Sequence, residues 1–182
     1  MTVGRIEVHE FISLDGVYES PSWTAEYAFD PKMGEAIGTL TGPGSELLLG
    51  RRTYEMFAPA WSTRTDEDDP GASFFNGARK NVVSSTLRDP DWNNSRVIGP
   101  YDPARIAELR DEVEGSLYVS GSGTLVRAML RDGLVDGLHL FVYPVVLGSG
   151  ERLFTGDELV RLSLTQTEAY DSGVVHLAYS QR

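Results

Sequence analysis

The sequence predicts an α/β fold with a mostly parallel central sheet and antiparallel strands at its C-terminal edge. Through the middle of the chain, short apolar segments alternate with segments of helical periodicity, as in parallel strands joined by helices. At the end of the chain, two strand-like segments follow one another directly, joined by the turn-forming Asp171-Ser172-Gly173. The chain has 182 residues, of which 41% are hydrophobic, and this suits one domain over 1–182.

Polar and apolar residues alternate from Val3 to Leu14, which predicts a first strand that ends at the turn Asp15-Gly16. The segment 17–30 that follows is irregular and rich in Ser, Pro and aromatic residues, so it is expected to cover another part of the molecule. One face of the first strand carries Ile6, Val8, Glu10 and Ile12.

Pro31 follows the capping residue Asp30, and apolar residues recur at helical spacing up to Gly42-Pro43-Gly44, which predicts a helix. A short buried strand over 46–49 leads into a second helix that starts at Gly50. The acidic segment that follows, Ser62 to Gly71, is expected to be a solvated loop.

In the second half, strands are expected over 79–84 and 96–99, and Asp102-Pro103 caps a helix. A strand over 117–120 passes through a glycine-rich turn into a helix over 125–131. The apolar segment 139–146 predicts another strand, and the C-terminal hairpin is expected over 164–170 and 174–180.

Composition excludes several classes of function. Lys and Arg total 16 against 27 Asp and Glu, and a net charge of −11 disfavours binding to nucleic acid or to an anionic membrane surface. The absence of cysteine excludes disulfides, zinc–thiolate sites and thiol nucleophiles. The N-terminus lacks the features of a signal peptide and no segment is apolar enough to span a bilayer, so a cytoplasmic protein is expected.

Three segments place small, hydroxyl or arginine residues directly after a predicted strand, where ligands bind in open α/β sheets. In Gly50-Arg51-Arg52-Thr53, guanidinium groups lie at a helix N-terminus, which favours an anion such as phosphate. Ser84-Ser85-Thr86 offers hydroxyls, and Gly121-Ser122-Gly123-Thr124 lets backbone amides approach a pyrophosphate. Solvated arginines, an ordinary loop and a plain strand-to-helix turn are the respective alternatives.

The sequence offers no site for a metal. Its three histidines lie in separate predicted strands without the spacing of a metal-binding pair, so a structural role is expected for each. No nucleophile elbow and no P-loop occur either. The histidines are His9, His139 and His176.

Several motifs taken in order resemble the dihydrofolate-reductase-like superfamily, and most closely the C-terminal reductase domain of the bifunctional riboflavin-biosynthesis deaminase/reductase. The similarity covers nearly the whole chain, and its most specific part is the G-R-x-T element followed later by the glycine-rich turn. The motifs are Ile12-Ser13-Leu14-Asp15-Gly16, then 48–55, Val82-Val83-Ser84-Ser85, 119–123, and Pro144 through Leu147-Gly148-Ser149-Gly150 to Leu153-Phe154.

The resemblance implies a three-layer fold with helices on both faces of the sheet, and an NADPH-dependent reductase. It assigns Arg51 and Thr53, next to Gly50 and Arg52, to the phosphates of the cofactor. Ser84 and Ser85 would receive the phosphate on the adenosine ribose. The glycine-rich turn would hold the pyrophosphate through Gly121, Ser122, Gly123 and Thr124.

The implied reaction is that of 5-amino-6-(5-phosphoribosylamino)uracil reductase. The loop 17–30 lacks the lysine usual in that family, and the first helix offers only Glu35 as an acid. A dihydrofolate-reductase-like enzyme for another substrate and a non-catalytic nucleotide-binding protein therefore stay open as alternatives.

The aromatic loop is interpreted as the lid of a substrate pocket. Trp23 and Tyr27 would stack on a planar substrate, and Asp15 or Glu26 would orient it or relay a proton, helped by a pKa raised by the surrounding rings. A homodimer joined partly through the C-terminal strands is also expected, from the apolar segment 139–146 and from the habit of the family.

Overall fold

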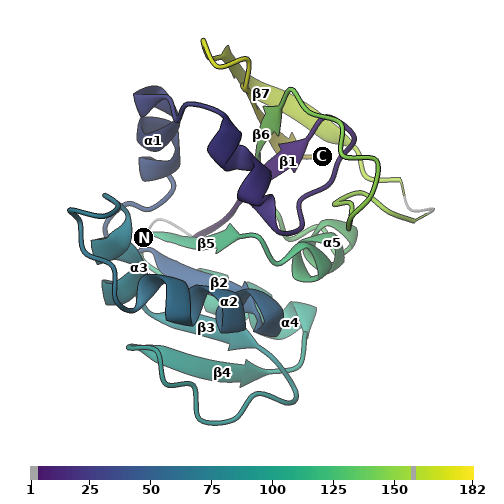
Figure 1. Cartoon of the computed structure of the whole chain (residues 1–182). Coiled ribbons are helices and arrows are strands. Elements are labelled where there is room, and N and C mark those ends of the chain that lie inside the picture. Colours follow the sequence, from purple (N-terminus) through teal and green to yellow (C-terminus); the bar gives the residue numbers. More distant parts are fainter. Residues whose placement is uncertain (1–3, 157–158) are drawn as a thin grey trace.

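The computed structural model describes residues 4–156 and 159–182, and it contains one eight-stranded sheet with the order β4-β3-β2-β5-β1-β6-β8-β7 (Figure 1). Residues 1–3, including the expected strand start at Val3, lie outside the described residues. The strands are β1 Arg5–Ser13, β2 Glu46–Gly50, β3 Lys80–Val83, β4 Ser95–Gly99, β5 Ser116–Ser120, β6 Gly137–Tyr143, β7 Leu162–Ala169 and β8 Val175–Gln181.

The sheet confirms the predicted fold class. Strands β1 to β6 pair in parallel, whereas β8 is antiparallel to both β6 and β7. The helices that surround it are η1 Pro21–Glu26, α1 Pro31–Gly38, α2 Arg51–Trp61, α3 Ala72–Gly77, α4 Pro103–Glu112 and α5 Gly123–Arg131.

Alternating side chains on each strand build separate cores on the two faces of the sheet. Ile6 and Val8 of β1 pack with α4 and α5 on one face. On the other face, Leu47 and Leu49 of β2 pack with α2 and α3, and Met33 of α1 belongs to a third cluster with Phe141 of β6.

Strand β1 continues beyond the end of β5, and this difference in length opens the sheet. The pairing of β1 with β5 ends at His9 opposite Ser120, whereas its pairing with β6 continues to Ser13 opposite Tyr143. The last part of β1 therefore has a strand on one side only, and the chain after β5 turns away from it.

The acidic segment 62–71 is an exposed loop, as predicted, but the helix that follows it was not predicted. Helix α3 has six residues, too few to display a helical period. Two carboxylates of the acidic segment accept hydrogen bonds from the start of this helix: Asp66 from the Ser73 amide at 2.8 Å and Asp69 from the Gly71 amide at 2.8 Å. Part of the acidic segment thus caps α3.

Two predicted boundaries shift because of neighbouring geometry. Helix α5 starts at Gly123, two residues earlier than expected, and β6 covers 137–143 and ends before Pro144, which cannot donate a ladder hydrogen bond.

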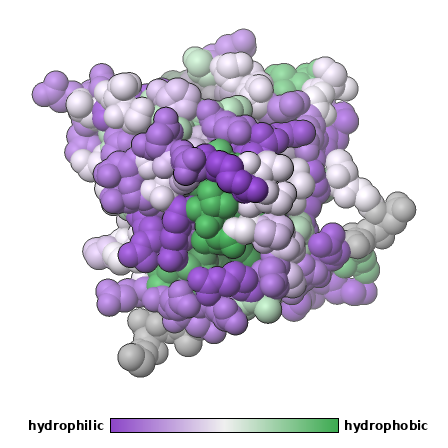
Figure 2. All heavy atoms as spheres, turned by 90° about the horizontal axis from the view of Figure 1, so that it is seen from below, coloured by the Kyte–Doolittle hydropathy of each residue, from purple (hydrophilic) through white to green (hydrophobic). Residues whose placement is uncertain are grey.

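Seen from the β4 side, the surface is largely hydrophilic around a narrow hydrophobic strip (Figure 2). No helix in the described part of the chain is long and apolar enough to cross a membrane.

Candidate active site

The first and third candidate phosphate-binding segments, which start at Gly50 and Gly121, meet at the carboxyl ends of β2 and β5. The Gly50 amide donates a hydrogen bond to Oγ of Ser122 at 3.0 Å, and the Ser122 amide donates to Oγ1 of Thr53 at 3.0 Å. These two bonds join the N-terminus of α2 to that of α5. Because both helix dipoles present their positive ends here, the junction favours an anion.

The backbone of the glycine-rich turn is shaped for this junction. Gly121 and Ser122 both have left-handed conformations, with φ of 63° and 60°. These conformations turn the chain sharply between the end of β5 and the start of α5. A left-handed serine is costly, and the hydrogen bonds of Ser122 to Gly50 and Thr53 hold it in place.

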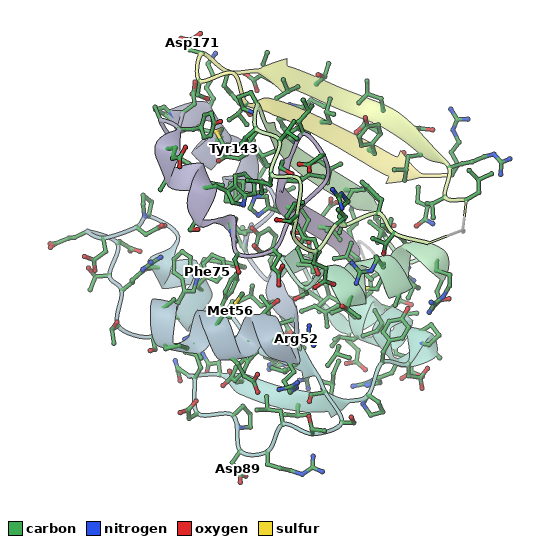
Figure 3. All side chains as sticks on the ribbon, turned by 45° about the vertical axis from the view of Figure 1, so that its right-hand side comes forward. Arg52, Met56, Phe75, Asp89, Tyr143 and Asp171 are labelled. Carbon is green, nitrogen blue, oxygen red and sulfur yellow. The ribbon has the colours of Figure 1, made fainter. Side chains whose placement is uncertain are left out.

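A cleft of about 1350 Å³ extends from this junction across the sheet. Its α2–α3 wall is apolar: Figure 3 shows Met56 and Phe75 on this wall, with Arg52 at the start of α2. Trp61 stacks on Phe75 with ring centroids 4.0 Å apart, which stabilises the wall. Other aromatic residues that line the cleft are Phe11, Tyr18, Phe29, Phe57, Phe74, Tyr101 and Tyr118.

The two arginines of the first segment both line the cleft but have different surroundings. Arg51 pairs with both carboxylate oxygens of Glu55 on the same helix, at 2.9 and 3.0 Å. Arg52 is exposed, and its guanidinium makes no hydrogen bond or ion pair with any described residue. Its guanidinium is therefore the one of the two that is available to a ligand without breaking a bond.

The second segment lies apart from the cleft lining. The Ser84 hydroxyl accepts hydrogen bonds from the amides of Thr86 at 3.1 Å and Leu87 at 2.9 Å, and Ser85 is exposed. The serines thus form a local turn after β3. The structure brings together the first and third segments and leaves Ser84 and Ser85 outside the residues that line the cleft.

The predicted acids are also outside the cleft lining, and the expected pKa of Asp15 is wrong. The Asp15 carboxylate accepts hydrogen bonds from Ser13, from the amides of Leu147 and Gly148 and from Arg152. These donors hold the pKa of Asp15 well below its usual range, because each stabilises the charged form. Asp15 therefore anchors the loop 147–152 as a carboxylate, and Glu26 is exposed at the end of η1.

The aromatic loop lines the cleft, but not with the residues that were expected. Trp23 and Tyr27 pack edge-on against Tyr143, at 5.3 and 5.4 Å, and neither is among the residues that line the cleft. Tyr18 and Phe29 of the same loop do line it. The expected stacking of Trp23 and Tyr27 on a substrate is therefore replaced by packing within the protein.

Comparison with known proteins now identifies the family. Residues 5–176 match the RibD C-terminal domain. The chain belongs to the RibD C-terminal domain family. Among curated proteins, the uncharacterized protein YyaP of Bacillus subtilis (strain 168) is 25% identical over 179 residues, which cover 96% of this chain and 94% of YyaP.

Solved structures share the fold. A protein of Shewanella sp. PV-4 provisionally assigned to riboflavin biosynthesis has a TM-score of 0.78 and 18% identity, over 98% of this chain and 99% of that one. The dihydrofolate reductase of Enterococcus faecalis, solved with NADP(H) and RAB-propyl, has a TM-score of 0.63 and 15% identity, over 99% and 98% of the two chains. This RibD C-terminal domain thus has the dihydrofolate-reductase-like fold and belongs to a family of oxidoreductases.

Sequence reasoning missed one acid of this RibD C-terminal domain. Glu10 of β1 is only 2% exposed and lines the cleft, and burial raises its pKa to about 8. The sequence pattern that could have identified Glu10 is its place as the one charged residue on a strand face that otherwise carries Ile6, Val8 and Ile12.

The three histidines of this RibD C-terminal domain lie on neighbouring strands. Nδ1 of His139 is 3.1 Å from Nε2 of His176, and Nε2 of His139 is 3.2 Å from Glu7. His9 instead contacts the Tyr118 hydroxyl at 2.9 Å, and burial lowers its pKa to about 3. Among the described residues, no group of three or more His, Asp or Glu side chains is arranged to hold a metal ion.

Proposed function

We propose that this protein is an NADPH-dependent reductase that acts on a small heterocyclic substrate, in the manner of 5-amino-6-(5-phosphoribosylamino)uracil reductase. The observation that carries the proposal is the junction of the α2 and α5 N-termini through Ser122, with the unpaired Arg52 beside it. Such a junction suits the pyrophosphate of a dinucleotide.

The cleft fits the proposed cofactor together with a substrate. Pockets for one small molecule usually measure about 300 to 1000 Å³, and this cleft measures about 1350 Å³. Its walls offer aromatic faces for flat rings and backbone amides for phosphates. Membership of the RibD C-terminal domain family and the NADP(H) bound to the similar dihydrofolate reductase support the same cofactor.

When bound, NADPH supplies the hydride, so the residues of this chain have to bind, orient and exclude water. In the proposal, Gly121, Gly123 and Thr124 present the anion-binding backbone. Gly50, Thr53 and Ser122 hold this backbone in shape through their hydrogen bonds. The apolar wall of α2 and α3 would shield the reacting rings from water.

Loss of Arg52 is expected to weaken NADPH binding far more than NADH binding. The two cofactors differ by one phosphate, and a charge-assisted hydrogen bond to it contributes roughly 1.5 to 3 kcal/mol, or about ten- to a hundredfold in affinity. Titration of wild type and Arg52→Ala with both cofactors measures this. The family resemblance instead favours Arg51, and Arg51→Ala is the matched variant.

Arg51→Ala is expected to change NADPH affinity by less than about threefold, because the Arg51 guanidinium already pairs with Glu55. A larger effect of Arg51→Ala than of Arg52→Ala would reverse the assignment. Equal affinity of the wild type for NADPH and NADH, or binding of neither, would refute the proposed cofactor.

We also propose a cytoplasmic homodimer that forms partly through the C-terminal strands. Strand β7 is an edge strand, and Leu164 on it is 55% exposed. A second copy that covers this surface would protect both the edge and the apolar side chain. Sedimentation is expected to give twice the chain mass of 20.0 kDa, and a monomer at micromolar concentration would contradict the dimer.

A further inference from the structure

Glu10 lies where the sheet opens into the cleft. His9 is the last residue of β1 that pairs with β5, so Glu10 is the first one beyond the end of that strand. On its other side Glu10 still pairs with Leu140 of β6. Glu10 is 2% exposed and lines the cleft together with Gly121 and Leu125.

The Glu10 carboxyl group has no partner that would compensate a buried charge. Oε1 is buried and forms no hydrogen bond with any described residue. Arg127 is the cation that acts on Glu10, but its guanidinium is bound to the Arg152 carbonyl at 3.0 Å, to Thr124 at 3.2 Å and to Glu151 at 2.8 Å. A buried carboxyl without an ion pair favours its neutral, protonated form.

The strand order indicates which half of the cofactor would lie next to Glu10. In the proposed function, the pyrophosphate lies on the turn after β5, and Arg52 after β2 reads the phosphate on the adenosine ribose. Strands β2 and β1 flank β5 on opposite sides. The adenosine half would therefore extend over β2, and the nicotinamide half would extend over β1.

We infer that Glu10 binds the nicotinamide riboside half of the cofactor by donating a hydrogen bond from a protonated carboxyl group. This inference rests on the proposed function. The acceptor would be a carboxamide or ribose oxygen, and this contact would satisfy a polar atom that is otherwise buried without a partner.

No other group around Glu10 is expected to titrate near pH 8. Arg127 of α5 stays charged, and burial raises the pKa of Tyr118 on β5 well above its usual range and that of Tyr18 to about 12. The pKa of Glu151 is lowered by Arg127. Leu140 of β6 does not titrate, burial lowers the pKa of His9 to about 3, and the cofactor phosphate titrates at about pH 6.

The test is NADPH affinity as a function of pH for the wild type and Glu10→Gln. Ionised Glu10 cannot donate, so wild-type affinity is expected to fall by about tenfold per pH unit above the Glu10 pKa of about 8. Glu10→Gln keeps a neutral donor and is expected to show no such fall. The adenosine fragment 2′-phospho-ADP-ribose lacks nicotinamide and is expected to bind the wild type without the fall.

The control is Glu26→Gln, which changes an exposed acid outside the cleft and is expected to keep the wild-type profile. An infrared titration of the free wild type provides a second measurement, because the band of a protonated carboxyl is expected at neutral pH and absent from Glu10→Gln.

The same fall in Glu10→Gln, or in the binding of 2′-phospho-ADP-ribose, would overturn the contact. Absence of the infrared band would overturn the protonated state. Failure of NADPH to bind at any pH would refute the proposed function itself.

Discussion

Replacement of Gly123 by alanine is expected to destabilise the protein by roughly 2 to 4 kcal/mol and to abolish binding of NADPH. A methyl group at this position would collide with the ring of Tyr18, with Cε1 and Cε2 at only 2.6 Å. Gly123 is buried at the start of α5. A shift of α5 away from Tyr18 would break the hydrogen bond between Ser122 and Thr53 that joins α5 to α2.

Tyr18 cannot easily move away either. Its amide donates a hydrogen bond to the Glu151 carbonyl at 3.1 Å, and Arg127 binds the Glu151 carboxylate at 2.8 Å. The methyl group would therefore displace either the loop 17–20 or the start of α5. Thermal unfolding is expected to shift by roughly 5 to 15 °C for a loss of this size.

The control is Gly38→Ala, because a methyl group at Gly38 meets nothing within 4 Å and the residue ends α1. This variant is expected to be neutral or slightly stabilising. The double variant Gly123→Ala with Tyr18→Ala is expected to recover part of the lost stability, since it removes the collision. A Gly123→Ala protein as stable as Gly38→Ala would contradict the close packing described.

Replacement of Glu10 by glutamine is expected to stabilise the protein increasingly as the pH rises from about 4.5 to about 8. In this interval the unfolded wild type releases the Glu10 proton, whereas the folded state retains it, so wild-type stability falls with pH. Below the interval both states are protonated, and above it both are ionised. The shift from 4.5 to about 8 corresponds to a difference on the order of 3 to 5 kcal/mol.

Chemical unfolding of the two proteins across this pH range measures the difference directly. Other titrating groups affect both proteins alike, so the difference between the curves isolates Glu10. Glu26→Gln replaces an exposed acid and is expected to give a curve parallel to that of the wild type. A Glu10→Gln curve that is also parallel to the wild type would mean that Glu10 titrates as an ordinary carboxyl.

The fold and the two segments that form the junction of α2 with α5 could be predicted largely from local patterns. Alternation located β1, and helical spacing with the capping residues Asp30 and Asp102 located α1 and α4. The carboxylate of each capping residue accepts a hydrogen bond from a backbone amide in the first turn of its helix. The segments starting at Gly50 and Gly121 were both interpreted as candidate phosphate sites after strands, and the structure brings them together. Their binding of NADPH stays a prediction.

Other features depend on contacts between residues far apart in the sequence, which local patterns do not encode. Asp15-Gly16 looks like a turn with a free acid, but the amides of Leu147 and Gly148 and the Arg152 guanidinium bind its carboxylate. Trp23 and Tyr27 look like ligand-stacking rings, but Tyr143 of β6 lies against both.

The sequence by itself determined that the strands run mostly in parallel and that small, hydroxyl and arginine residues follow two of them, because periodicity and strand-end residues are local. Only the tertiary structure decided that Arg52 is the unpaired arginine, that Tyr18 closes over Gly123, and that Glu10 lies in the cleft. Each of these depends on which chain segment occupies the neighbouring space. For Glu10, that space opens because β5 ends four residues before β1 does, at the pair of His9 with Ser120.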